Sequence, residues 1–432
     1  MDAPAVQVTS SHTHPLRLLV VAVFLAAVFI SSEKAGQTEI ARIAVEQSAL
    51  YTQERAVAVT PPERSMTLTT PPFPPQAVTI TDLFPEVVSP AREVSLPQPA
   101  LPQVSTPSVV RGVYLTGYSA GNEKTVTRTL ALIDETEINA VIIDIKDATG
   151  KLSYQPLDPS LQAFGVGSNR IGNLSVLITR LHEKGVYVIG RISVFQDPFY
   201  ASHFSDEAFL DTRTGDMWRD YKGISWLKPD SRSVWDYTLA IARDAHAQGF
   251  DEINLDYVRF PSDGPLAYLQ KLTTPGTRAD VMESFFAYIS PFFKQEGITL
   301  SVDLFGLTMS AADDLGIGQK LERIAPYVDF IAPMVYPSHF AAGSYGIASP
   351  AAHPAEVIAH SLAQGKQKLE TAGLDPAMLR PWLQDFNLGA VYTSDMVRGQ
   401  IDASEALGLS SWMLWDPANT YTRGALLPEG VL

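Results

Sequence analysis

The chain of 432 residues contains no cysteine. Disulfide bonds, thiol nucleophiles and thiolate metal ligands are therefore all excluded. The absence of cysteine leaves the cellular compartment open, because a chain of this length can bury a core that needs no disulfide to be stable.

Positive charge is also scarce. The chain has 32 Lys and Arg residues against 47 Asp and Glu residues, which gives a formal net charge of -15 and a pI near 5.0. Nucleic-acid binding depends on basic side chains that neutralise phosphates. We therefore expect no nucleic-acid partner, and an uncharged or cationic ligand fits the chain better.

Histidine is rare where a metal site would need it. Of eight histidines, only His339 lies just beyond a predicted strand. A metal-dependent hydrolase barrel normally brings several histidines to its strand ends. A glycine-rich loop of the kind that binds phosphate is also missing after the seventh and eighth predicted strands. We therefore predict no metal and no cofactor.

The N-terminal region contains an uninterrupted apolar run from Leu18 to Ile30, preceded by Arg17. The run has the length of a signal-peptide core and is short for a membrane span of about 20 residues. No small-x-small cleavage site follows it. We expect residues 1–35 to be a signal peptide or an uncleaved signal-anchor helix, which makes the protein membrane-anchored or secreted with its folded domain extracytoplasmic.

Residues 36–108 are rich in proline, with Thr, Val, Gln and Ser between the prolines. This composition favours extended chain over packed elements. We interpret the segment as a linker, or stalk, that leads to one folded domain over residues 109–432.

Apolar, β-branched runs alternate with helical patterns throughout that domain. Eight strands are predicted, at Arg111–Tyr118, Asn139–Asp147, Val186–Phe195, Glu252–Phe260, Thr299–Gly306, Val328–Tyr336, Leu379–Phe386 and Ser410–Asp416. Helices are predicted between them, at Lys124–Glu135, Leu174–Lys184, Val234–Gln248, Ala279–Gln295, Gly318–Ala325, Ala355–Gly373 and Ser394–Ala406. Eight such units predict an α/β fold, a closed (β/α)8 TIM barrel, with an open doubly wound sheet as the alternative.

Strand parity predicts which side chains face the barrel axis, because successive side chains alternate between the two faces of a strand. In the fourth strand Ile253 and Leu255 suit the helix side, which leaves Asp256 facing inward. The same counting places further polar and aromatic residues at the inner strand ends: Asp144, Lys146, Arg191, Asp303, Tyr336, Gln384 and Asp416. Catalytic residues of TIM barrels lie at these C-terminal strand ends.

Aromatic residues near the strand ends suggest flat surfaces that stack on sugar rings. Trp382 and Trp412 suit the core, and Trp415 suits the mouth of the barrel. Trp218 and Trp226 are harder to explain as core residues, because the segment 211–229 carries little other hydrophobic material.

Eight segments carry a resemblance to a known family. They are RGVYLTGYSAG, INAVIIDIKDATGKLSY, GRISVFQDP, FDEINLDYVRFPSDG, VDLFGLT, VDFIAPMVYPSHF, RPWLQDF and WMLWDPANTYT. In this order they resemble a glycoside-hydrolase-like TIM-barrel family that long stood as a domain of unknown function. The resemblance covers nearly all of Arg111 to Thr422. It implies an exported or membrane-tethered barrel with a carboxylate after the fourth strand, and Asp256 matches that position.

Glycoside hydrolysis generally needs two carboxyl groups, one as proton donor and one as nucleophile or base. Asp303 on the neighbouring strand is the first choice as partner of Asp256. Asp385 is the alternative, although parity points it outward unless its strand has already ended, and Asp144 is the third candidate. The residues predicted to bind the polysaccharide or oligosaccharide substrate are Asp144, Lys146, Arg191, Arg259, Tyr336, Gln384, Trp415 and Asp416.

Two alternatives remain open from the sequence. Any one of the aspartates can be part of an ion network with Arg191 or Lys146, and Arg259 can be a salt-bridge anchor of its loop. The barrel as a whole can also be a non-catalytic carbohydrate-binding protein at the cell surface, in which Asp256 only binds sugar hydroxyls. No motif identifies the envelope or extracellular polysaccharide that would be the substrate.

Overall fold

The computed structural model describes residues 103–429. The predicted membrane segment and most of the predicted stalk lie outside these residues. Within residues 103–429, no helix combines the length and apolar character needed to cross a membrane.

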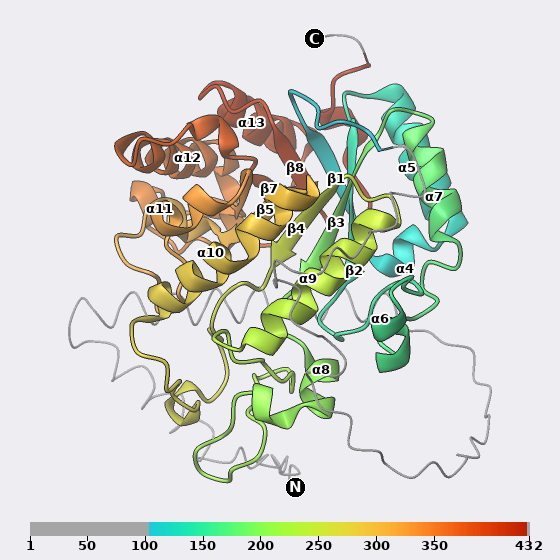
Figure 1. The fold of residues 1–432 in the computed structure, drawn as a ribbon. Coiled ribbons are helices and arrows are strands. Elements are labelled where there is room, and N and C mark those ends of the chain that lie inside the picture. The colour runs from blue at the N-terminus through green and yellow to red at the C-terminus, as the bar shows by residue number, and fades with distance from the viewer. Residues whose placement is uncertain (1–102, 430–432) are drawn as a thin grey trace, which may run out of the picture.

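Eight parallel strands close into a barrel in the order β1 to β8 (Figure 1). They are β1 (Arg111–Leu115), β2 (Ala140–Lys146), β3 (Tyr187–Ser193), β4 (Glu252–Asp256), β5 (Thr299–Phe305), β6 (Phe330–Met334), β7 (Trp382–Gln384) and β8 (Trp412–Trp415). Each lies inside a predicted strand, and β1 pairs with β8 to complete the ring. The predicted TIM barrel is confirmed, and the open sheet is excluded.

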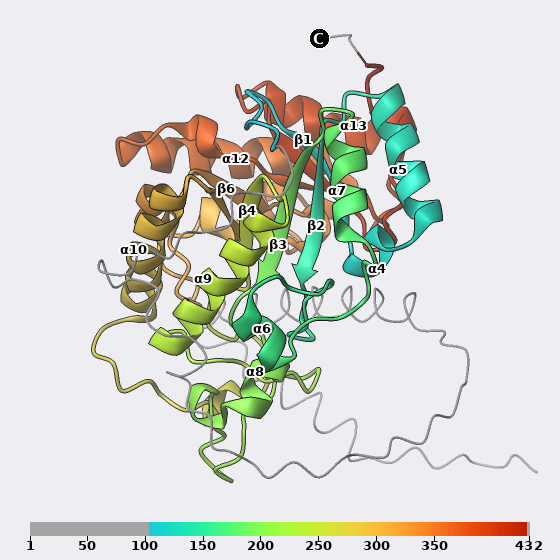
Figure 2. The ribbon, with the colours of Figure 1, turned by 45° about the vertical axis from the view of Figure 1, so that its right-hand side comes forward.

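Helices follow the strands and surround the barrel (Figures 1 and 2). They are α4 (Gly117–Ala120), α5 (Glu123–Glu135), α6 (Pro159–Phe164), α7 (Leu174–His182), α8 (Pro198–His203), α9 (Arg232–Ala247), α10 (Arg278–Glu296), α11 (Leu321–Ile324), α12 (Pro354–Thr371) and α13 (Ser394–Glu405). Helix starts carry the expected side-chain caps: Asn122 caps α5, Ser231 caps α9, and Thr277 forms a capping box with Asp280 on α10.

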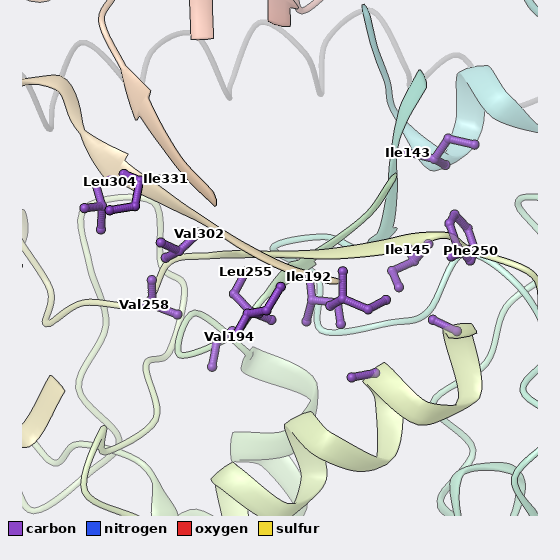
Figure 3. Close-up of a cluster of buried hydrophobic side chains, with 14 of the residues drawn as sticks. Ile143, Ile145, Ile192, Val194, Phe250, Leu255, Val258, Val302, Leu304 and Ile331 are labelled. Carbon is purple, nitrogen blue, oxygen red and sulfur yellow. The ribbon is translucent and has the colours of Figure 1, made fainter. Parts of the chain in front are cut away.

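The hydrophobic core has an outer and an inner part. Outward-facing residues of the strands pack against the helices, and Figure 3 shows Ile192, Leu255 and Val302 among the members of this layer. Burying each such side chain contributes about 1.5–3 kcal/mol. The inner part is a separate cluster that includes Tyr114 and Trp382. The strands are thus covered on both faces, which is why they read as continuous apolar runs.

The end of the stalk packs across the N-terminal end of the barrel. The backbone N–H of Val104 donates to Asp251, just before β4, and Thr106 hydrogen-bonds to Tyr187 and Thr299, the first residues of β3 and β5. The chain therefore enters the barrel from the end opposite the strand termini where TIM barrels place their chemistry.

Candidate active site

Arg191 on β3 binds three carboxylates inside the barrel. Its Nη1 atom donates to Asp144 Oδ1 on β2 at 2.6 Å, and its Nε atom donates to Asp303 Oδ2 on β5 at 3.1 Å. Its Nη2 atom donates to Asp256 Oδ2 on β4. All four side chains are at least nine-tenths buried. The structure thus brings together the four charged residues that parity placed on the inner face of neighbouring strands.

Two of these carboxylates accept further hydrogen bonds from side chains other than that of Arg191. Oδ1 of Asp303 accepts from Asn254 Nδ2 at 3.0 Å and from the indole Nε1 of Trp382 at 2.8 Å. The hydroxyl of Tyr114 donates to Asp144 Oδ2. Asp303 therefore accepts three hydrogen bonds, and its orientation is fixed. Tyr114 and Trp382 were not predicted as site residues, although strand alternation places both side chains inward.

Asp256 is positioned by the backbone as well as by Arg191. Its Oδ1 atom accepts from the backbone N–H of Tyr257 at 2.6 Å. Tyr257 has φ of 53°, a left-handed conformation that is unusual for a bulky side chain. Such strain collects at functional sites, where the surrounding structure over-determines it. The strained residue directly after β4 turns the chain at the point where Asp256 ends the strand.

Burial and mutual repulsion set the protonation of this group. Burial raises the pKa of Asp303, and the neighbouring charge of Asp256 raises it further. Burial also raises the pKa of Asp144, while Arg191 opposes that rise. Burial alone would lower the pKa of Arg191, but the charges of Asp256, Asp144 and Asp303 raise it well above its usual value. One permanent positive charge thus faces three carboxyl groups, and close carboxyls rarely ionise together.

Asp385 belongs to a second acidic group beside β8. Strand β7 ends at Gln384, so Asp385 is released from the strand alternation and its carboxylate accepts from the backbone N–H and hydroxyl of Thr422 at 2.7 and 2.6 Å. Burial raises its pKa to about 7, with a smaller contribution from the charge of Asp416. Burial also raises the pKa of Asp416 to about 6. Within residues 103–429, neither of these two carboxylates contacts Arg191.

Aromatic rings cover the charged group. Trp415 stacks on Tyr114 with ring centroids 3.9 Å apart, and the Arg191 guanidinium lies 5.1 Å from the Trp415 ring. Tyr336 lies next to Trp415, with a centroid distance of 6.5 Å. Stacked aromatic and guanidinium planes add a favourable electrostatic contact to their burial. Trp415, predicted to bind substrate, thus lies next to Arg191 inside the barrel, and Tyr336, also predicted to bind substrate, lies next to Trp415.

Gln384, predicted to bind substrate, joins two loops at the mouth of the barrel. It is fully buried, its Oε1 atom accepts from the backbone N–H of Ser338, and its Nε2 atom donates to the backbone oxygen of Phe386. Both ends of the amide are therefore used to join the loops that follow β6 and β7. Gln384 thus shapes the mouth of the barrel, and its role in substrate binding stays a prediction.

Lys146 does not face the barrel axis, and the parity prediction for it is wrong. A register shift in β2 follows Asp144, so that Lys146 pairs with Ile192, a residue of the outer core. Such a bulge reverses the face of the residues beyond it. The Lys146 ammonium forms a buried ion pair of 2.6 Å with Asp197 and lies 5.2 Å from the ring of Tyr237 on α9. Lys146 therefore joins β2 to the loop after β3 and to α9.

Trp218 and Trp226 are core residues, and the suggestion that they present free faces to sugars is wrong. Both are at most 1% exposed. The loop after β3 folds on itself through bridges such as Ala208 to Leu227, and the indole of Trp226 donates to Asp220 at 3.0 Å. Hydrophobic residues from other loops, including Phe260, complete this small core. The sequence window alone did not contain these partners.

Arg259 is buried in the loop after β4 but is not a salt-bridge anchor. Its Nη1 atom donates to the backbone oxygen of Phe260 at 3.1 Å and to Ser262 Oγ at 2.9 Å. Three aromatic rings surround the guanidinium, those of Trp226, Phe305 and Tyr257, at 4.8, 4.7 and 5.2 Å. It forms no ion pair with a carboxylate in residues 103–429.

The chain is similar to several solved structures, of which the first named below supports the fold. The chain is similar to the PgaB (BpsB) glycoside hydrolase domain from Bordetella bronchiseptica, with a TM-score of 0.54, 12% identity, and coverage of 72% of this chain and 95% of that one. It also matches a hypothetical protein from Ruminiclostridium thermocellum ATCC 27405 at 30% identity and a TM-score of 0.41, over 48% of this chain and 98% of that one. A chitinase from Chromobacterium violaceum ATCC 12472 matches at 14% identity and a TM-score of 0.43, over 73% of this chain and 96% of that one.

No curated protein matches the chain. A family model does match it, over residues 112–421, and this family is described as "Putative glycosyl hydrolase domain". The matched range contains all of the strand ends described above except the first residue of β1. The resemblance seen in the sequence is thereby confirmed, and the chain belongs to this glycosyl hydrolase domain family.

Proposed function

We propose that this protein is a glycoside hydrolase that cleaves O-glycosidic bonds of an envelope or extracellular polysaccharide. The observation that carries the proposal is the buried group of three carboxylates around Arg191 at the C-terminal strand ends. Buried charges are costly unless they are paired or used, and a scaffold would not need three aspartates on one arginine. Export is supported by the apolar run Leu18–Ile30 in the sequence.

Asp256 is the proposed carboxylate that faces the glycosidic bond. It ends its strand, and the Arg191 guanidinium and the Tyr257 N–H hold its two oxygens. Asp303 is the proposed partner, because it shares Arg191 with Asp256 and its pKa is raised by burial and by the Asp256 charge. A carboxyl with a raised pKa holds a proton near neutral pH, as the donor to a leaving oxygen must. Asp385 is the alternative donor.

The experiment is a comparison of wild type with Asp256→Asn on a panel of wall and extracellular polysaccharides, with detection of new reducing ends. The substitution keeps the shape and an acceptor for Tyr257 but removes the charge. We expect turnover to fall by at least roughly 10²-fold, the usual contribution of a catalytic carboxyl, while polysaccharide binding is retained. A wild-type protein that binds glycans and never releases reducing ends contradicts the enzymatic proposal.

A non-catalytic carbohydrate-binding barrel is the second candidate, and one observation favours it. Every oxygen of Asp144, Asp256 and Asp303 already accepts a hydrogen bond from the protein, so none of these carboxyl groups is left unbonded for proton transfer. Under this alternative Asp256→Asn weakens folding and ligand binding together, and no substrate of the wild type is found.

A further inference from the structure

Four arginines of residues 103–429 are buried, and they differ in how their charge is compensated. Arg191 binds three aspartates, Arg380 pairs with Glu252 at 2.8 Å, and Arg111 pairs with Glu137 and Glu405. Arg259, which is 6% exposed, has no carboxylate partner within residues 103–429. An arginine cannot lose its proton in a protein, and a buried charge without a counter-charge is strongly destabilising.

Only one of the three guanidinium nitrogens of Arg259, Nη1, forms hydrogen bonds within residues 103–429. Nη1 makes both hydrogen bonds to the loop, to Phe260 and Ser262. Nε and Nη2 donate to nothing within residues 103–429, and neither is sealed from solvent as the unpaired Nε and Nη2 atoms of Arg380 are. The free edge carries two parallel N–H groups, the geometry that accepts a carboxylate in a bidentate pair.

The surroundings of this edge are largely aromatic, and no carboxylate within residues 103–429 is bonded to it. The rings of Trp226, Tyr257 and Phe305 line the guanidinium. Nearby Asp220 is already occupied, since it accepts from the Trp226 indole and from Gln196. Burial and, to a smaller extent, the charge of Asp220 raise the pKa of Asp263 to about 6. Asp263 acts on Arg259 only through its charge, since no hydrogen bond or ion pair joins the two side chains within residues 103–429.

We propose that the Nε and Nη2 edge of Arg259 binds the carboxylate of an acidic sugar unit of the substrate. The inference rests on the proposed function, because the subsite lies three residues after Asp256, on the loop that leaves β4. The net charge of -15 disfavours a densely charged polyanion. The expected ligand is therefore a polysaccharide in which isolated acidic units stand between uncharged ones.

The test uses the full chain and a matched pair of ligands. One is a tetrasaccharide of alternating glucuronate and N-acetylglucosamine, and the other is the same tetrasaccharide with its carboxylates methyl-esterified. Binding is measured by calorimetry for the wild type, for Arg259→Met, which keeps the apolar stem, and for Arg213→Met, which removes an exposed arginine of the neighbouring loop. Thermal unfolding of each variant monitors its fold.

We expect the wild type to bind the acid roughly 10- to 100-fold more tightly than the ester, as a charged bidentate pair implies. Arg259→Met abolishes that difference without weakening the ester, and Arg213→Met preserves it. If the wild type binds acid and ester equally, or binds neither, the inference is overturned. The measurement on the wild type alone is enough to show this. Equal weakening of both ligands by a folded Arg259→Met also overturns it, since Arg259 would then only support the loop.

The same samples separate this inference from the proposed function. Preference for the acid without release of reducing ends from any polysaccharide supports the Arg259 subsite and contradicts the hydrolase. Release of reducing ends without any preference for the acid supports the hydrolase and contradicts the subsite.

Discussion

The Nε atom of Arg191 on β3 and Oδ2 of Asp303 on β5 form a hydrogen bond of 3.1 Å, although β4 lies between the two strands. The long arginine side chain reaches across the barrel interior, and the fork of its guanidinium lets it bind Asp144 and Asp256 at the same time. A lysine has a single ammonium group and cannot present three donors in this fixed geometry.

We therefore predict that Arg191→Lys lowers the free energy of unfolding by roughly 3 kcal/mol or more, the usual effect of leaving buried charges without their partner. Urea unfolding measures this loss. The control is Arg423→Lys, which alters a 2.6 Å pair with Glu135 between half-exposed side chains and should change stability little. An Arg191→Lys protein as stable as the wild type would show that the three carboxylates do not need the guanidinium group of Arg191 for the stability of the fold.

The identity of the second carboxylate can be tested by comparing Asp303→Asn with Asp385→Asn. Asp303 shares Arg191 with Asp256, whereas Asp385 is bonded to Thr422 beside β8. We expect Asp303→Asn to reduce kcat by at least roughly 10²-fold and Asp385→Asn to reduce it by less than about 10-fold.

An aryl glycoside with an acidic leaving group sharpens this comparison, because its departure needs no proton donor. If Asp385→Asn lowers kcat on the polysaccharide more than Asp303→Asn does, and its kcat is restored on the aryl glycoside, then Asp385 and not Asp303 is the proton donor.

Lys146 was predicted to bind substrate, but it lies outside the barrel interior, and its structural role can be tested. Its ion pair with Asp197 is almost completely buried, so Lys146→Met leaves an uncompensated carboxylate and should destabilise the fold by about 3–5 kcal/mol. Asp197→Asn in the same chain removes that charge but keeps the amide oxygen to cap α8, where Asp197 accepts from Tyr200. We expect the double variant to recover part of the stability.

The activity of each folded Lys146 variant should match that of the wild type, because Lys146 faces α9 and not the barrel axis. A selective loss of activity in a fully folded Lys146→Met protein would return this residue to the site.

Much of the barrel could be predicted from alternation alone. The period of two in the strands placed Asp144, Arg191, Asp256 and Asp303 on one face, and the structure joins these four through one guanidinium. This success has a simple cause, since closed parallel strands with helices on one side leave only the barrel interior for charged residues.

The wrong predictions have two causes, a strand irregularity and contacts between distant loops. One extra residue in β2 turns Lys146 to the outer face, and a bulge leaves no mark in an otherwise apolar run. Trp226 is buried because distant loops fold over it, and such partners cannot be found within one window of sequence. The bonding of Arg259 could not be predicted either, because its surroundings come from the loops after β3 and β4 and from the end of β5.

Asp385 should make stability depend on pH in a direction opposite to that of most carboxylates. Its pKa in the folded protein is about 7 because it is buried, well above the usual value near 4. The folded state therefore holds this proton more tightly than the unfolded state does, so its contribution is most favourable below about pH 4. Stability is lost as pH rises from about 4 to 7, by roughly 4 kcal/mol at most, and no further loss occurs above that range.

Asp385→Asn removes the titration but keeps an acceptor for the Thr422 N–H, so we expect its melting temperature to exceed that of the wild type at pH 8 and to converge with it at pH 4. Asp211→Asn is the control of opposite sign, because hydrogen bonds from Arg213 lower the pKa of Asp211 to about 2. That group stabilises the fold above pH 4 and loses its effect as pH falls towards 2. Melting curves of the three proteins between pH 2 and 8 check both signs. An Asp385→Asn curve parallel to that of the wild type would mean that Asp385 stays ionised in its buried position beside Thr422.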